Sequence, residues 1–477
     1  MKPSRPAPPR AQGRPPSRPA PRSRRAPEEK PNLRALAARL LEEILAGNQS
    51  LKGVVQREQK RLSREDDRAL LRELVAGVVR HLPHLDRVLE AHTEREMGRV
   101  QPELLQILRV GAYQILLLDR VPAYAAVHEC VKAAKALNPG AGGFVNGVLR
   151  SLSEHREEAL EAPLAYAGGE GAALRLGMPR WLVDRYEARF GLEAEPLLRA
   201  LAEPGVPSLL FLGPPAEAAA LPILSREGFR LERDPVLPFT HRVLSGDPSR
   251  SEAFRQGLFY VMDGASQVPA LLLPVKPGNR VLDLCAAPGG KSVRLVLRTG
   301  GQIFLVAADR NRRRLRQMAE NFRRLSLGAI RVAAVDAAAP LPFAAPFDAV
   351  LLDAPCSSLG TLRKNPEIRW QMAEEHLKRH HLRQVALLER AAEGVREGGA
   401  LLYSVCSLEP EETVEAVEAF LDRRPDFRPR PLDAGEDLAS RLTPAGEGMA
   451  YLLPHRTSWD GFFVALLARK GSGRARK

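Results

Sequence analysis

The sequence predicts an α/β protein: a doubly wound sheet in the C-terminal part, preceded by an all-α domain and a small α+β module. Two patterns carry this prediction. After residue 280, apolar strand-like runs alternate with helical segments, which is typical of a parallel sheet covered on both faces. Between residues 32 and 153, apolar residues recur at helical spacing throughout. A chain of 477 residues is long enough for about three domains.

Residues 1–31 are predicted to form a disordered basic arm. They are rich in arginine and proline and lack apolar periodicity, so they cannot bury enough surface to offset the entropy of ordering. They also lack the apolar core of a signal peptide. The arm either contacts RNA or is a solvated tail, and residues 471–477 form a second basic tail.

The formal net charge of +14 suits a polyanionic partner such as nucleic acid, although the basic termini inflate it. No stretch approaches the roughly 20 apolar residues of a membrane span. The four cysteines form no C-x-x-C pair and have no flanking histidine ligands, which argues against zinc and against a disulfide scaffold. We therefore expect a metal-free monomer in the reducing cytoplasm.

Residues 32–155 are expected to be an α-helical domain. Asn32 can cap its first helix, and Ser63 followed by Asp66 resembles a capping box ahead of another. Further helices are predicted over 104–118, 123–137 and 144–152. Cys130 lies on one of them among apolar neighbours, so a packing role is expected.

Residues 160–270 have a mixed pattern that indicates a small α+β module, with a helix opened by Pro179 and a strand near 209–212. Residues 271–470 should form the doubly wound domain. Its strands are predicted at 281–284, 303–308, 330–335, 349–352 and 400–403, its helices at 312–325 and 376–396, and its last strands at 449–453 and 460–467.

The loop after the first of these strands predicts a cofactor site. It consists of Cys285, Ala286, Ala287, Pro288, Gly289, Gly290 and Lys291. Adjacent glycines at a strand-to-helix turn let a ligand approach the backbone, and the helix N-terminus offers free N–H groups. The next strands end in Asp309, placed to accept ribose hydroxyls, and Asp336, placed to meet an adenine edge. Either carboxylate alone could equally be a helix cap.

The same loop contains neither G-x-G-x-x-G nor G-x-x-x-x-G-K-[ST], which argues against a dehydrogenase and against nucleotide triphosphate hydrolysis. S-adenosylmethionine carries an adenosine and an amino-acid end but no phosphate. It therefore suits a loop without a phosphate cradle.

Two cysteines directly follow predicted buried strands: Cys356 in D-A-P-C-S and Cys406 in Y-S-V-C-S. Ligands of open α/β sheets bind just outside the carboxyl ends of the strands. Two thiols at that edge indicate sulfur chemistry. The alternative is that both are small apolar fillers, a common role for buried cysteine.

Taken together, C-A-A-P-G-G-K from residue 285, D-A-P-C-S from 353 and C-S from 406 resemble the NOL1/NOP2/Sun RNA (cytosine-5) methyltransferases. M-D-G-A-S from 262 and D-G-F-F from 460 resemble that family too, and the likeness spans about 165–470. F-V-N-G-V-L from 144 is similar to a NusB-type RNA-binding domain. Such a pair resembles bacterial small-subunit rRNA methyltransferases. It implies a Rossmann-like class I methyltransferase domain, S-adenosylmethionine as cofactor and 16S rRNA as partner, with cytosine 967 as target.

The resemblance implies that Cys406 attacks C6 of the cytosine and that Cys356 assists release of the adduct; covalent catalysis divides one hard step into easier ones. Asp353 is placed to bind the base edge, and Lys291 to hold a substrate or cofactor carboxylate. The segment from Ser407 to Pro410 is expected to lead into a helix, whose dipole would favour the Cys406 thiolate. At residue 405 the family usually has threonine, and Val405 lacks that hydroxyl.

Basic residues near these loops are candidate RNA contacts. Arg312 and Arg313 place positive charge in a first helical turn, where it opposes the helix dipole, so helix stability does not explain them. Arg363 and Lys364 follow the Cys356 loop and lie nearer the expected site. A solvated face is the alternative for the arginine run.

Two rival functions remain open. The first is a DNA cytosine-5 methyltransferase, in which Cys356 would be the nucleophile. The second is a non-catalytic RNA-binding assembly factor built on the NusB-type region.

Overall fold

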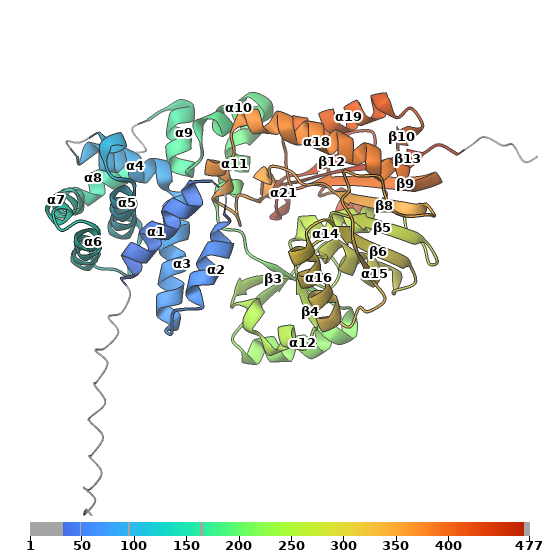
Figure 1. The fold of residues 1–477 in the computed structure, drawn as a ribbon, viewed down its shortest axis with the longest axis horizontal. Helices are drawn as coiled ribbons and strands as arrows, with labels where there is room; N and C mark the ends of the chain where they lie inside the picture. Colours follow the sequence, from blue (N-terminus) through green and yellow to red (C-terminus); the bar gives the residue numbers. More distant parts are fainter. Residues whose placement is uncertain (1–31, 48, 94–95, 163–165, 472–477) are drawn as a thin grey trace, which may run out of the picture.

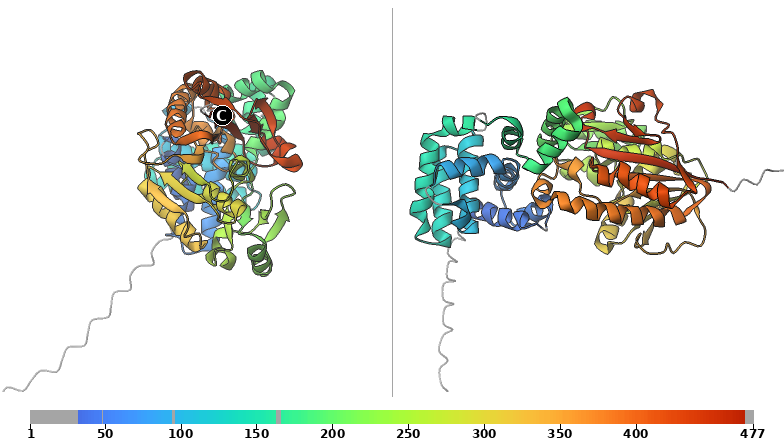
Figure 2. Two further views of the ribbon diagram at one scale, coloured as in Figure 1. Left: turned by 90° about the vertical axis from the view of Figure 1, so that its right-hand side faces the viewer. Right: turned by 90° about the horizontal axis from the view of Figure 1, so that it is seen from above.

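A computed structural model describes residues 32–47, 49–93, 96–162 and 166–471. The predicted basic arm and residues 472–477 of the basic tail lie outside the described residues. The helical domain and the large sheet occupy opposite ends of the molecule, and a smaller sheet lies beside the large one (Figure 1). Figure 2 shows the same separation from above.

The N-terminal domain consists of helices around one apolar core. They are α1 (Leu33–Leu45), α2 (Leu51–Gln59), α3 (Glu65–Arg80), α4 (Leu82–Ala91), α5 (Pro102–Leu117), α6 (Ala123–Leu137), α7 (Ala141–Glu154) and α8 (Arg156–Glu161). Asn32 caps α1 as predicted, because its side chain accepts the backbone N–H groups of Arg34 and Ala35. The capping box at Ser63 was wrong: Arg64 is the N-cap of α3 and makes no side-chain capping bond.

Three helices follow that pack on the large sheet. They are α9 (Gly168–Leu176), α10 (Arg180–Phe190) and α11 (Ala194–Ala202). The small module begins only after them. Its antiparallel sheet has the order β2-β3-β1-β4. Its elements are β1 (Ser208–Phe211), α12 (Pro214–Arg226), β2 (Arg230–Arg233), β3 (Thr240–Ser245), α13 (Glu252–Arg255) and β4 (Phe259–Val261).

The large sheet has nine strands in the order β11-β12-β13-β9-β8-β5-β6-β7, with β10 beside β13. The strands are β5 (Arg280–Leu284), β6 (Phe304–Asp309), β7 (Arg331–Ala334), β8 (Phe347–Asp353), β9 (Val395–Val405), β10 (Phe427–Pro429), β11 (Thr443–Gly446), β12 (Met449–Leu452) and β13 (Phe462–Arg469). Strands β5 to β9 run parallel, and β13 adds an antiparallel partner to β9.

Helices cover both faces of this sheet, which confirms the doubly wound fold. One apolar cluster joins the sheet to α14 (Gly264–Leu272), α15 (Gly290–Thr299) and α16 (Arg312–Arg324). The other joins it to α9–α11, α18 (Glu374–Glu393) and α19 (Val414–Arg423). The helix predicted over 376–396 was too long at its end, because Gly394 separates it from β9. Short helices α17 (Ile368–Gln371), α20 (Gly435–Ala439) and α21 (Pro454–Thr457) complete the chain.

The helical domain contacts the large domain through the segment 367–371, which contains α17. The Leu51 N–H donates to Glu367 Oε1 at 3.0 Å, and Trp370 Nε1 donates to the Val79 carbonyl at 2.7 Å. This segment follows the Cys356 loop by about ten residues, so the helical domain is joined to the part of the chain that carries one of the two thiols. Among the helices of the described residues, none combines the length and apolarity needed to cross a membrane.

Candidate active site

The sheet brings the two predicted thiols together. β8 and β9 are parallel neighbours with Asp353 opposite Ser404, so the loops that follow them start at the same level. The Sγ atoms of Cys356 and Cys406 lie 3.4 Å apart, and both side chains are half-buried. The hydrogen bond with Cys406, together with burial, raises the pKa of the Cys356 thiol well above its ordinary value.

Asp353 and Lys291 also meet at this edge. Lys291 Nζ lies 2.6 Å from Asp353 Oδ2, and Ser404 Oγ donates to Asp353 Oδ1 at 2.9 Å. The ammonium group also lies 5.0 Å from the centre of the Phe462 ring, within range of a cation–π contact. Lys291 therefore joins the predicted cofactor loop to the end of β8.

The loop from Cys285 to Lys291 turns sharply between β5 and α15. Cys285 has a left-handed backbone with φ of 59°, and Gly289 has φ of 103°. A Cβ at Gly289 would lie 2.7 Å from the Phe322 ring, so only glycine fits there. Burial and the nearby carboxylates raise the pKa of Cys285 to about 12, which leaves its thiol protonated. The structure thus gives Cys285 a backbone role in the turn.

The carboxylates that end β6 and follow β7 differ in exposure. Asp309 is buried, and its oxygens accept the N–H groups of Asn311 at 2.8 Å and Ala287 at 3.3 Å. Asp336 is exposed and lines a groove of about 510 Å³. The other residues along this groove are Arg310, Asn311, Arg312, Ala334 and Val335.

The arginine run at the start of α16 has a partial structural explanation. Arg314 lies 3.7 Å from Asp309 Oδ2 and donates to the Ala287 carbonyl, so it fastens the cofactor loop to the helix. These contacts with the cofactor loop and Asp309 account for a basic residue at Arg314. Arg312 and Arg313 remain exposed.

One carboxylate at this edge was missed. Asp283 is the penultimate residue of β5, is fully buried and accepts a hydrogen bond from Ser292 Oγ at 2.6 Å. Burial raises its pKa to about 7, and its Oδ1 atom has no hydrogen-bond partner. A carboxylate inside an apolar strand was a signal that the sequence offered.

A second missed residue, Glu412, holds both cysteine loops. Its buried carboxylate accepts hydrogen bonds from the backbone N–H of Ser357 at 2.7 Å, from Ser357 Oγ and from Gln384 Nε2 at 3.0 Å. Ser357 Oγ also lies 3.3 Å from Ser407 Oγ. The residues that follow the two thiols are thus tied to one buried glutamate. Its proximity could not be read from the sequence, because it comes 55 residues after Ser357.

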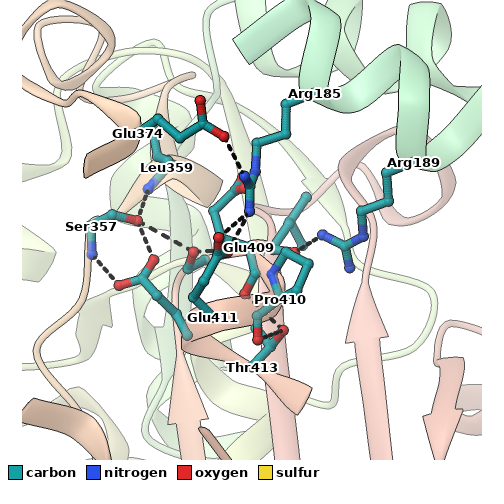
Figure 3. Close-up of polar contacts among 12 residues, drawn as sticks. Arg185, Arg189, Ser357, Leu359, Glu374, Glu409, Pro410, Glu411 and Thr413 are labelled. Carbon is teal, nitrogen blue, oxygen red and sulfur yellow. Dashed lines mark hydrogen bonds and ion pairs between the residues drawn. The ribbon is translucent and has the colours of Figure 1, made fainter. Parts of the chain in front are cut away.

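Helix α10 clamps the segment after Cys406, as Figure 3 shows. Arg185 donates to Glu409 at 2.6 Å, to Glu374 at 2.8 Å and to Glu411. Arg189 donates to the Leu408 carbonyl. Burial raises the pKa of Glu409, and the neighbouring guanidinium groups oppose that effect. Residues far upstream of the sheet therefore position the loop that carries Cys406.

The segment after Cys406 leads into a helix as predicted: a 3-10 turn at Pro410–Glu412 precedes α19, which begins at Val414. The effect expected of Val405 needs correction. Val405 is fully buried on one face of β9, whereas Cys406 packs against the cluster on the opposite face. A hydroxyl at position 405 would therefore face away from the thiol.

The predicted RNA contacts after Cys356 have partners within the protein. Lys364 Nζ lies between the carboxylates of Asp263 and Asp460, the latter at 3.1 Å. Arg363 donates to the carbonyls of Ser458 and Trp459 at 2.7 and 3.1 Å. Both cations thus connect the Cys356 loop to the M-D-G-A-S and D-G-F-F segments.

Cys130 is fully buried in the helical domain, and burial raises its pKa to about 12, consistent with packing. Within the parts of the chain that the structure describes, no group of three or more His, Cys, Asp or Glu side chains could hold a metal ion.

The residues at the carboxyl edge fit S-adenosylmethionine. The groove beside Asp309 and Asp336 offers an exposed carboxylate and backbone edges, which suit an adenosine. Asp283 Oδ1, buried and unpartnered, is a free acceptor beneath the loop. Lys291 supplies a cation of the sign needed for an amino-acid carboxylate.

Comparison with known proteins bears on this arrangement. Residues 270–468 match the family model "16S rRNA methyltransferase RsmB/F", and residues 31–154 match the NusB family. The chain is 34% identical to the ribosomal RNA small subunit methyltransferase B of Cronobacter sakazakii, over 92% of this chain and 99% of that protein. The chain belongs to the RsmB/F family. This confirms both predicted resemblances.

Other relatives agree. The ribosomal RNA small subunit methyltransferase B of Yersinia pestis is 32% identical over 92% of this chain and 99% of that protein. Among solved structures, PH0851 matches with a TM-score of 0.74 at 26% identity, covering 92% of this chain and 99% of that one. The RsmB/F likeness therefore extends over the helical domain, the module and the large sheet, and this protein is a methyltransferase.

Proposed function

We propose that this protein transfers a methyl group from S-adenosylmethionine to C5 of a cytosine in 16S rRNA, through a covalent bond between Cys406 and C6 of the base. The observation that carries the proposal is the pair of thiols, 3.4 Å apart at adjacent strand ends and beside the Lys291–Asp353 ion pair. The names of the relatives support rRNA as the substrate. Cytosine 967 is the target implied by resemblance.

Covalent attack solves a chemical difficulty. Cytosine C5 is a poor nucleophile, and bond formation between a thiolate and C6 moves the electrons of the C5–C6 double bond to C5. After C5 has taken the methyl group, a base must accept the C5 proton. The electrons of the C5–H bond then re-form the C5–C6 double bond, and the Cys406 sulfur leaves as a thiolate. Cys356, 3.4 Å away, is placed to assist this release.

The environment of the two thiols supports this division of roles. The raised pKa of Cys356 disfavours its thiolate near neutral pH, so this side chain is poorly suited to nucleophilic attack; its thiolate, when formed, is a strong base for the C5 proton. The Asp353 carboxylate has lone pairs that Lys291 and Ser404 do not use. These would accept a hydrogen bond from the cytosine amino group. A target cytosine must leave its stack to reach this edge.

When bound, the cofactor supplies a methyl group on a sulfonium. Asp309 and Asp336 would hold its adenosine, and the loop from Cys285 to Lys291 would hold its amino-acid end. Exposed Arg312 and Arg313 are proposed to contact RNA phosphates, and Arg363 and Lys364 to hold the loop against the RNA. We expect a monomer that acts where ribosomes assemble, in the cytoplasm.

Covalent trapping tests the proposal. Cys356→Ala and Cys406→Ala variants are incubated with S-adenosylmethionine and small-subunit rRNA and run on a denaturing gel. Cys356→Ala should accumulate an RNA–protein adduct because release fails, and Cys406→Ala should form none. The matched control is Cys130→Ala, a buried cysteine far from the site, which should behave as the wild type.

The rivals predict other patterns. An adduct that accumulates in Cys406→Ala and disappears in Cys356→Ala would make Cys356 the nucleophile and contradict the assigned roles. Methylation of DNA and not of rRNA would identify a DNA enzyme. RNA binding without methyl transfer or adduct by the wild type would indicate an assembly factor.

A further inference from the structure

A hydroxyl group outside the sequence motifs lies between the two thiols. Ser358 Oγ is 3.5 Å from Cys406 Sγ and 4.0 Å from Cys356 Sγ, while the sulfur atoms are 3.4 Å apart. The three atoms form a closed triangle at the sheet edge. Ser358 is half-buried, as the two cysteines are.

The backbone around Ser358 is fixed on both sides. Before it, the Ser357 N–H is bound by Glu412; after it, the Gly360 N–H donates to the Cys406 carbonyl at 3.0 Å. The carbonyl of Ser358 itself accepts the N–H of Thr361 at 2.9 Å. The hydrogen bond from Gly360 to the Cys406 carbonyl therefore holds the segment that carries the Ser358 hydroxyl next to Cys406.

Ser358 has a left-handed conformation, with φ of 62° and ψ of 21°. Side chains with a Cβ pay a steric penalty in this region, whereas glycine adopts it freely. Backbone geometry alone would thus favour glycine at this position. The hydroxyl is the feature that glycine lacks, and its contact with the thiols accounts for serine.

We propose that Ser358 is a further catalytic residue, whose hydroxyl donates a hydrogen bond to the Cys406 thiolate and favours that charged form for attack. The inference rests on the proposed function in taking Cys406 as the nucleophile. Hydrogen bonding to the charged form of a group favours that form. The Ser358 hydroxyl lies 3.5 Å from the Cys406 sulfur and so supplies a hydroxyl at the nucleophile, where Val405 has none.

The proton balance is simple. In the thiol state the Cys406 S–H group donates a hydrogen bond to Ser358 Oγ, as in the structure. On ionisation that proton passes to solvent, and the serine O–H rotates about its C–O bond to become the donor. The other titratable groups that face the pair are Cys356, Glu412 and, 3.8 Å from Glu412, His380. Burial lowers the pKa of His380, which leaves the imidazole neutral.

Two variants separate the hydroxyl from the backbone. Ser358→Ala removes the hydroxyl and retains a Cβ in the left-handed conformation, whereas Ser358→Gly removes the hydroxyl and relaxes the backbone. The full-length protein, without RNA or cofactor, is alkylated with iodoacetamide across a pH series, and mass spectrometry follows the peptide that contains Cys406. Both variants should react about tenfold more slowly at neutral pH, since a hydrogen bond to a charged group contributes about one such factor.

The same two variants should lower kcat for methyl transfer about tenfold with little change in KM for RNA. Wild-type alkylation profiles in both would overturn the proposal. Slow reaction in Ser358→Ala that Ser358→Gly restores would also overturn it, because backbone strain would then be the cause. Alkylation needs no methyl transfer, so failure of the proposed function would appear separately, as a Cys356→Ala variant that forms no RNA adduct.

Discussion

The carboxyl edge of the large sheet has two halves that are held in different ways. In the half formed by β5, β6 and β7, carboxylates are fixed by nearby groups: Asp283 by Ser292 and Asp309 by Asn311. In the half formed by β8 and β9, the thiol loops are fixed by Glu412 and by arginines of α10, which lie far away in the sequence. The contacts described for the first half join residues 2 to 27 positions apart, whereas those of the second half join residues 55 to 224 positions apart.

This contrast suits the chemistry proposed for each half. A cofactor site needs a stable backbone surface, which a strand-to-helix turn provides on its own. Two thiols that share one base must be placed relative to each other, and an error of about 1 Å can reduce a rate about a hundredfold. The carboxylate of Glu412, a residue of the segment after Cys406, binds the loop after Cys356 and so fixes that spacing.

Breaking the thiol half should have the largest effect. Glu412→Ala leaves the N–H and O–H of Ser357 and the amide of Gln384 without their acceptor. Unsatisfied buried donors cost about 1–3 kcal/mol each, so urea unfolding should show a loss of about 5 kcal/mol. Methyl transfer should fall at least about a hundredfold. Glu412→Gln keeps one acceptor oxygen and should retain part of the stability and part of the activity. Wild-type activity in Glu412→Ala would show that Glu412 does not position the thiols.

The carboxylate half can be tested through pH. Asp283 has a folded pKa of about 7 against an ordinary value of 3.8, because burial disfavours its charge. The folded state therefore binds the proton more tightly than the unfolded state. Its contribution to stability is greatest at low pH and is lost as pH rises through about 7. A difference of about three pKa units corresponds to about 4 kcal/mol.

Asp283→Asn should abolish that loss, so its unfolding free energy should change less between about pH 4 and pH 8 than that of the wild type. The matched control is Asp336→Asn, an exposed carboxylate of the same half. Thermal unfolding across the pH series measures the difference. Identical slopes in wild type and Asp283→Asn would show that Asp283 has the same pKa in the folded and unfolded states, and that burial does not disfavour its charge.

The contrast also explains what the sequence could reveal. Local features were readable: the alternation of strands and helices, the Asn32 cap, the glycine turn, and the cysteines at strand ends. Glu412, Arg185 and Ser358 could not be found, because their roles depend on contacts across many residues or on a backbone angle. Lys364 shows the same limit: its charge suggested RNA, and its position between two carboxylates could not be read from the sequence.

The ion pair between the halves should have an intermediate effect. Lys291→Met removes the partner of Asp353 and leaves that carboxylate with Ser404 alone. A hydrogen bond to a charged group contributes about 2 kcal/mol, and urea unfolding should show about that loss. Lys291→Arg keeps the charge and should lose less. Equal losses in both variants would mean that packing of the lysine stem, and not its charge, joins the two halves.

Two tyrosines, one in each half of the edge, should show the smallest effects on stability when replaced. The Tyr260 hydroxyl donates to the Pro288 carbonyl of the cofactor loop at 3.0 Å, and the Tyr451 hydroxyl lies 2.7 Å from Thr413 Oγ1 behind the thiol loop. Replacing either with phenylalanine removes one hydrogen bond from a buried ring, so each variant should lose about 1 kcal/mol on unfolding. Their functional effects should differ. Tyr260→Phe should weaken binding of S-adenosylmethionine in calorimetric titration, whereas Tyr451→Phe should slow methyl transfer at saturating cofactor. If both variants weaken cofactor binding, the two halves of the edge do not act separately, and the charged groups of the thiol half also position the cofactor.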